Sequence, residues 1–383
     1  MSLRDYDQDA VKHYVRYDGW LEACQARNRR VKNAIEGQRR TQPFTYFSFC
    51  ASQAIDVFML EKAKLLQRDR NTKRLNHVFF CEENDTEFEK ISNLLGSREA
   101  GFLGNFKDFV LFEDNADTIN IDVSNNNMPV PGSLALRQKL ENRRLNLDFR
   151  SLFPLDVVNL DICGIFFPPA TNVVSPMLEA VDRIFKWQRE NQSREDAHTS
   201  EGFTLIITTH VEADACNPDV LTQLVNIAQS NIDDYPEFGQ KLDRKYGYSS
   251  PTLLKDNNFP VFFSIIFPKV IAHVARKHDW FGKHRKIYLY TRPSHPQYHM
   301  MCSVVHYERM PTVPHQLPGV SRQLWPNGYE NRYLNEICNI VTYRPVDVNQ
   351  KFATDARLAT DVVADLRSII TYRDNLRATL ALG

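Results

Sequence analysis

The sequence lacks a dominant charge and a long apolar run, and both absences narrow the class of protein. Lys and Arg together number 47, as do Asp and Glu, so no overall field draws the chain to nucleic acid or to an anionic membrane. No run of about 18 apolar residues occurs, and the opening "MSLRDYDQDAV" has no apolar core. We therefore expect a cytoplasmic protein with no membrane contact.

Paired cysteines and metal-binding histidine motifs are missing as well. The seven cysteines are scattered and form no C-x-x-C pair, which favours a reducing cytosol over a disulfide framework or a zinc site. The late histidines, between residues 273 and 306, fit no motif such as H-E-x-x-H. The sequence predicts no metal site.

Two glycine-rich signatures of nucleotide binding, GxxxxGK[ST] and GxGxxG, do not occur. Residues 44–60 read "FTYFSFCASQAIDVFML", which indicates a buried strand, a sharp turn and a helix. A nucleotide-binding α/β domain usually carries glycines in this turn, and here there are none. The stretch is either a cofactor site with an unusual lining or a site that has stopped binding a cofactor.

Apolar runs alternate with helical patterns along most of the chain. The predicted strands are 44–50, 77–81, 108–112, 154–164, 203–211, 286–291 and 299–307, and the predicted helices between them are 54–67, 85–95, 133–145, 176–190, 218–230 and 260–276. Such alternation argues for a parallel sheet covered by helices on both faces. The loop between the last two strands is too short for a crossover helix, so these strands must pair antiparallel.

Helical segments flank this α/β unit at both ends. We divide the chain into a helical N-terminal extension (1–40), an α/β domain (41–309) and a C-terminal extension (310–383). The closing segment, 354–379, repeats apolar residues on one helical face. That face either docks on the core or pairs with a protein partner.

Acidic residues follow several predicted strands, at "CEEND", "FEDNAD" and "NLDICG". In open α/β sheets the ligand crevice lies beyond the carboxyl ends of the strands, near the point where the strand order reverses. These carboxylates therefore mark a candidate site.

This combination of a helical prefix, alternating elements, a final antiparallel hairpin and acidic strand ends resembles the class I S-adenosylmethionine-dependent methyltransferases, over about residues 40–309. The resemblance implies a Rossmann-like methyltransferase fold with a mixed seven-stranded sheet and S-adenosylmethionine as cofactor. It further implies that Glu82, with Glu83 as a neighbouring candidate, binds the ribose hydroxyls, that Asp114 and Asn115 face the adenine, and that Asp161 faces the substrate as the catalytic residue.

Plainer roles stand beside these. Glu82 and Glu83 could cap the following helix, and Asp114 could form a turn.

The first turn departs from the family pattern, because Cys50, Ala51 and Ser52 stand where glycines would contact the cofactor. A Cβ at each position narrows the pocket, and a positive φ costs of the order of 1 kcal/mol per residue. Two functions therefore remain open. The chain is a divergent methyltransferase, or it is a catalytically inactive scaffold or binding subunit of the same fold.

Basic residues gather at 27–32, 38–40 and 137–144. These helical patches make nucleic acid a candidate partner. Glutamates intervene among these residues and aromatics do not interleave, so a solvated helix face is the competing interpretation.

Overall fold

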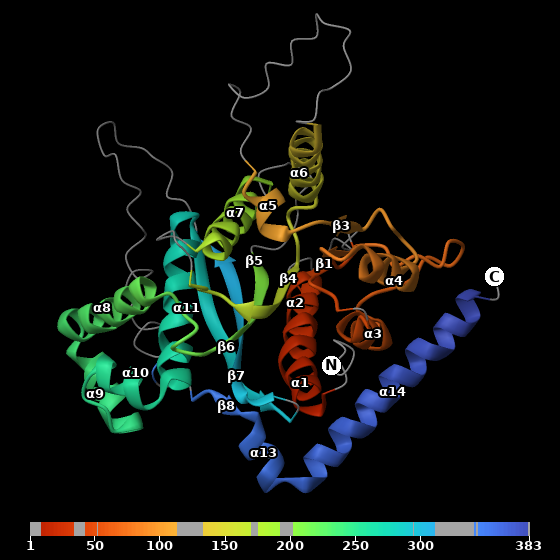
Figure 1. The fold of residues 1–383 in the computed structure, drawn as a ribbon. Coiled ribbons are helices and arrows are strands. Elements are labelled where there is room, and N and C mark those ends of the chain that lie inside the picture. Colours follow the sequence, from red (N-terminus) through yellow and green to blue (C-terminus); the bar gives the residue numbers. More distant parts are fainter. Residues whose placement is uncertain are drawn as a thin grey trace, which may run out of the picture.

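The computed structural model describes residues 9–33, 43–51, 53–112, 133–169, 175–191, 202–293, 295–310, 341 and 344–381. Over these residues the chain forms one mixed, open sheet in the order β3-β2-β1-β4-β5-β7-β6-β8 (Figure 1). The strands are β1 (Tyr46–Ser48), β2 (Val78–Glu82), β3 (Gly101–Leu103), β4 (Val157–Ile165), β5 (Gly202–His210), β6 (Trp280–Arg292), β7 (His295–Arg309) and β8 (Val346–Asp347). Strands β1 to β5 are parallel to one another, and β7 runs antiparallel to both β5 and β6. The predicted α/β class and the terminal hairpin are confirmed.

Helices cover both faces of the sheet, and Figure 1 shows α2 on one side and α11 on the other. The first face carries α1 (Ala10–Val15), the π-helical turn η2 (Arg16–Leu21), α2 (Glu22–Asn33), α3 (Ile55–Lys62), α4 (Asp85–Leu95), α13 (Val348–Thr354) and α14 (Ala356–Ala381). The second face carries α5 (Phe106–Val110), α6 (Ser133–Ser151), α7 (Pro176–Asn191), α8 (Pro218–Asp234), α9 (Pro236–Tyr246), α10 (Pro251–Asn257) and α11 (Phe259–Lys277).

Alternation along each strand divides the apolar residues between two cores. Tyr46 lies in the core under α1 to α4, whereas Phe47 lies in the opposite core. This is the period of two expected for a strand that is buried on both faces.

One predicted strand, 108–112, is wrong. Residues 106–110 form α5, and the third strand is the short segment 101–103. Phe106, Phe109 and Val110 have helical spacing and are buried together, and Asn105 starts the helix by accepting a hydrogen bond from the Lys107 amide. The sheet also has eight strands rather than seven, because β8 pairs with β6 near the C-terminus.

The predicted helices are confirmed with small shifts of their ends. The largest shifts are in the helix predicted over 133–145, which continues to Ser151, and in the helix predicted over 54–67, since α3 ends at Lys62 and a turn follows. The closing helix docks on the core, with Val362, Leu366 and Ile369 buried against the first face.

Within the described residues one helix, α11, is long and apolar enough to cross a membrane by length and composition. It lies inside the fold, and its phenylalanines pack in the core of the second face. This is the pattern of a buried core helix.

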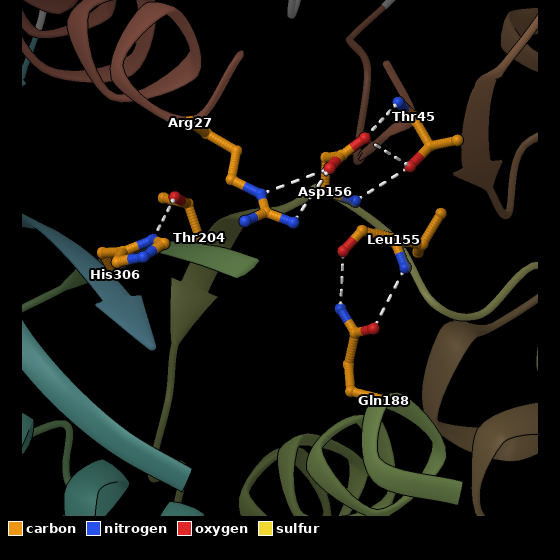
Figure 2. Close-up of polar contacts among 7 residues, drawn as sticks. All are labelled: Arg27, Thr45, Leu155, Asp156, Gln188, Thr204 and His306. Atoms are coloured by element: carbon orange, nitrogen blue, oxygen red, sulfur yellow. Dashed lines mark hydrogen bonds and ion pairs between the residues drawn. The ribbon is translucent and has the colours of Figure 1, made fainter. Parts of the chain in front are cut away.

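A buried ion pair fastens the N-terminal helices to the sheet at the start of β4 (Figure 2). Arg27 of α2 contacts Asp156, with 3.2 Å from Nε to Oδ1, and both side chains are 3% exposed. Asp156 also accepts hydrogen bonds from the Thr45 amide and hydroxyl. The N-terminal extension therefore shares a core with the α/β unit.

Candidate functional site

The strand order reverses between β1 and β4, which lie side by side at the centre of the sheet. Ser48, in β1, is paired in register with Phe80 and with Asn159 on its two neighbours. Two residues further along these strands come Cys50, Glu82 and Asp161, at one level of the sheet. The structure thus brings these three predicted residues together at the reversal point, where open α/β sheets bind ligands.

The other predicted cofactor residues cannot be placed in this way. Ser52, Asp114 and Asn115 lie outside the described residues, so their roles stay predictions. Ala51 follows Cys50 at the start of the turn and is half-buried, while Cys50 itself is 2% exposed.

A left-handed residue closes the turn between β1 and α3. Ala54 has φ 45°, and its amide donates a 2.8 Å hydrogen bond to the Ala51 carbonyl. An alanine in this region is strained, because its Cβ crowds the following carbonyl. Such outliers persist only where the surroundings impose them, and they concentrate at functional sites.

Beneath the turn lies a buried polar cluster that the sequence analysis missed. Asp56, in the first turn of α3, accepts hydrogen bonds from the Tyr46 hydroxyl at 2.7 Å and the Ser48 hydroxyl at 2.8 Å. Asn159 donates to the same two hydroxyls. Burial and the nearby Asp56 raise the pKa of Tyr46 well above its usual value. The alternation of polar Tyr46, Ser48 and Asn159 on one face of β1 and β4 was the available signal.

Glu82, the last residue of β2, presents a half-buried carboxylate at this edge. It accepts a 2.9 Å hydrogen bond from the Asn84 amide, and no cationic side chain of the described residues pairs with it. Burial, together with the like charges of Glu83 and Glu87, raises the pKa of Glu82. Its remaining acceptor positions suit a donor such as a sugar hydroxyl.

The plainer role at the helix start fits Glu82 and not Glu83, since Glu82 accepts from the amide of Asn84, the N-cap of α4. Asn84 is the N-cap of α4, and its side chain accepts from the Glu87 amide at 3.1 Å. Glu83 instead accepts a 3.3 Å hydrogen bond from the Asn105 side chain, next to β3. Glu83 therefore bridges the ends of β2 and β3.

The sequence led us to expect Asp161 just after the end of its strand. It instead lies inside β4, which continues to Ile165. It ends the regular pairing with β5, since the register shifts between Asp161 and Ile165. Lys12 of α1 lies 2.7 Å from its carboxylate, and the two side chains are 2% and 7% exposed. A buried ion pair under α1 thus occupies the place predicted to face the substrate.

Further polar groups surround this ion pair. Burial and the nearby negative charge of Asp161 raise the pKa of Tyr290 and the pKa of Cys302, the latter to about 12. Within the described part of the chain, the Tyr290 hydroxyl is buried and has no hydrogen-bond partner.

The C-terminal helix reaches the turn from the other end of the chain. Arg373 of α14 is buried and donates a hydrogen bond from Nη1 to Gln53 Oε1. Asp374 accepts from Nε and Nη2 of the same guanidinium at 2.9 and 2.8 Å. No local pattern in the sequence indicates this contact.

The described cations of the basic patches are largely engaged with acids. Arg27 forms the buried pair with Asp156, and Arg30 lies 3.3 Å from Glu308. On α6, Arg144 bonds to both Glu141 and Asp148. A solvated, ion-paired face explains Arg30 and Arg144, whereas Arg27 is buried, and nucleic-acid binding stays a prediction.

No group of three or more His, Cys, Asp or Glu side chains that could hold a metal ion occurs within the described ranges. The cysteines whose side chains can be described there are buried and form no disulfide bond: Cys24, Cys50, Cys81, Cys216 and Cys302. Burial raises the pKa of Cys216 to about 12, which disfavours a thiolate nucleophile at that position.

The fold and this edge define a protein with an open, mixed α/β sheet and polar strand ends at its reversal point. The PP_RS20740-like family matches residues 145–373, more than half of the chain, and the chain belongs to that family. The matched segment includes Asp161 and Arg373 and begins after Cys50 and Glu82. No curated protein and no solved structure matches the chain.

Proposed function

We propose that the chain binds S-adenosylmethionine at the carboxyl ends of β1 and β2 and acts as a divergent methyltransferase. The observation that carries this proposal is Glu82. Its half-buried carboxylate ends a strand next to the reversal point and is contacted by the backbone amides of the two residues that follow it, Glu83 and Asn84. A carboxylate in this state offers two oxygens to the two hydroxyls of a ribose.

The residues of the turn fit the cofactor less closely than glycines would. Ala51 and Gln53 carry side chains, and Gln53 is held by Arg373. We propose that the turn contacts the amino-acid end of the cofactor through backbone amides, with Cys50 packed beneath it. The bound cofactor would supply a methyl group on sulfur, and this chain would contribute mainly proximity and alignment.

Asp161 is proposed to act as a fixed charge in this reaction. Lys12 lies 2.7 Å from its carboxylate under α1, and this buried ion pair fixes the position of the carboxylate. In the proposed reaction it would orient groups near the acceptor rather than deprotonate it.

A second function, that of a binding subunit without catalysis, is favoured by the same ion pair. If Asp161 serves only to dock α1, the chain holds no other assigned group for the chemical step. The fold would then present its surfaces to a partner while the reversal point binds cofactor weakly or not at all.

Isothermal titration with S-adenosylmethionine and with its demethylated product tests the first function. We expect micromolar binding that falls about tenfold or more in Glu82→Gln, because a hydrogen bond to a charged acceptor is worth roughly 1.5–3 kcal/mol. Glu83→Gln is the matched control, since Glu83 is held by Asn105. The absence of heat and of thermal stabilisation with either compound would refute cofactor binding and leave the second function.

A further inference from the structure

The strained alanine in the turn requires an external support. Ala54 adopts a left-handed conformation, φ 45°, at the position just before α3. Its own hydrogen bonds, to Ala51 and from the Phe58 amide at 3.1 Å, are those of any turn that starts a helix. These two hydrogen bonds do not favour the left-handed conformation of Ala54 over a relaxed one. The strain is therefore offset by contacts from elsewhere in the fold.

Such a contact comes from α14. Arg373 is buried and donates to Gln53, the residue directly before Ala54. Because Asp374 accepts two hydrogen bonds from the same guanidinium, the planar group is fixed in orientation as it reaches the turn.

Helix α14 is itself anchored on α3, which follows the turn, and on α1. Asp365 lies 3.0 Å from His13 Nε2 of α1 and 3.4 Å from Lys62 Nζ of α3. Lys62 also donates to Ser368 at 2.9 Å. These contacts set the position of α14 relative to α3, so Arg373 meets Gln53 with little freedom to move.

We infer that Arg373 is a positioning residue that holds the glycine-free turn in its binding conformation, so that the C-terminal helix completes the cofactor site. The inference rests on the proposed function for its ligand. The role it assigns to the turn itself can be measured without a ligand. In this fold the Arg373 side chain is a clamp that holds the turn in a conformation that a turn with glycines would adopt without strain.

The first experiment follows amide hydrogen exchange in peptides covering residues 50–58 of the full chain, without ligand. Arg373→Met and Gln53→Ala should each accelerate exchange at Ala54 by about tenfold or more, the factor expected for the loss of a charged hydrogen bond. Arg367→Met, an exposed arginine of the same helix, is the control and should leave the rate unchanged. Unchanged exchange in both clamp variants would overturn the inference.

The second experiment asks whether relief of the strain replaces the clamp. Ala54→Gly removes the Cβ that makes a positive φ costly, an effect of about fivefold or more. Added to Arg373→Met, it should restore slow exchange and, where the wild type binds S-adenosylmethionine, most of the lost affinity. A combined variant no slower than Arg373→Met would contradict the positioning role, since simple loss of packing by α14 is not repaired at residue 54.

The two proposals fail in different ways. If the wild type binds neither S-adenosylmethionine nor its demethylated product, the proposed function is refuted, and the exchange rates still decide the role of Arg373. If the wild type binds and Arg373→Met binds equally well, the cofactor site stands and the clamp does not.

Discussion

Replacement of Arg27 by methionine should destabilise the protein far more than the same change at Arg30, three residues further along α2. Arg27 and Asp156 are each 3% exposed, and loss of one partner from a buried pair costs about 3–5 kcal/mol. Asp156 keeps its two hydrogen bonds from Thr45 (Figure 2), so we expect the lower end of that range. About 3 kcal/mol corresponds to roughly two orders of magnitude in the unfolding equilibrium.

Urea unfolding followed by circular dichroism measures this difference, provided that the slope of the transition is unchanged. Arg30→Met is the control, because Arg30 and its partner Glu308 are 40% and 32% exposed and such a pair contributes about 1 kcal/mol or less. The double variant Arg27→Met/Asp156→Asn should lose less free energy of unfolding than the sum of the losses in the two single variants, since it leaves no unpaired buried charge. Equal losses at Arg27 and Arg30 would refute the assignment of the buried pair as the attachment of the N-terminal helices.

Three further outcomes are expected. Burial lowers the pKa of His13 from 6.5, and the hydrogen bond from His13 lowers the pKa of Asp365 from 3.8. As the pH falls the unfolded chain therefore takes up each proton first, so the free energy of unfolding should decrease below about pH 6.5 and again below about pH 3.8. In urea titrations His13→Gln should lose the first of these two decreases. Gly202→Ala should lower the free energy of unfolding by about 1–3 kcal/mol, because a Cβ at residue 202 would clash with a backbone carbonyl of β7. Gly164→Ala is the control, since a Cβ at residue 164 has no atom within 4 Å. Equal melting temperatures of the two variants would contradict the register of β5 with β7. Since the pKa of Glu82 is raised above 4.5 and the proposed contact needs its ionised form, affinity for S-adenosylmethionine should rise with pH through that pKa, and a flat profile would argue against a ribose contact.

Local patterns in the sequence predicted most of the fold. The alternation of apolar runs and helical periods located β1, β2, β4, β5 and the hairpin, because each is set by neighbouring residues. The third strand was misplaced, since "FVLF" reads equally well as a short strand or as one buried turn of helix. A single capping residue, Asn105, decided in favour of the helix.

The sequence could predict only those site residues whose place follows from their position at the end of a strand. Cys50, Glu82 and Asp161 are level because β2, β1 and β4 are parallel neighbours. The partners of these residues come from distant segments. Lys12 lies in the N-terminal helix α1, far along the chain from Asp161, and Arg373 lies 320 residues from Gln53, so no local pattern could have indicated either contact.

That sequence separation also sets an order of events during synthesis. The turn with Gln53 and the strand with Glu82 leave the ribosome before α14, and Arg373 follows Gln53 only after a further 320 residues. At about 5–20 residues per second this delay is of the order of tens of seconds. A nascent or truncated chain that stops before α14 would hold its sheet and its acidic strand ends yet lack the clamp on the turn, so the proposed ligand site would be completed only after α14 has been made.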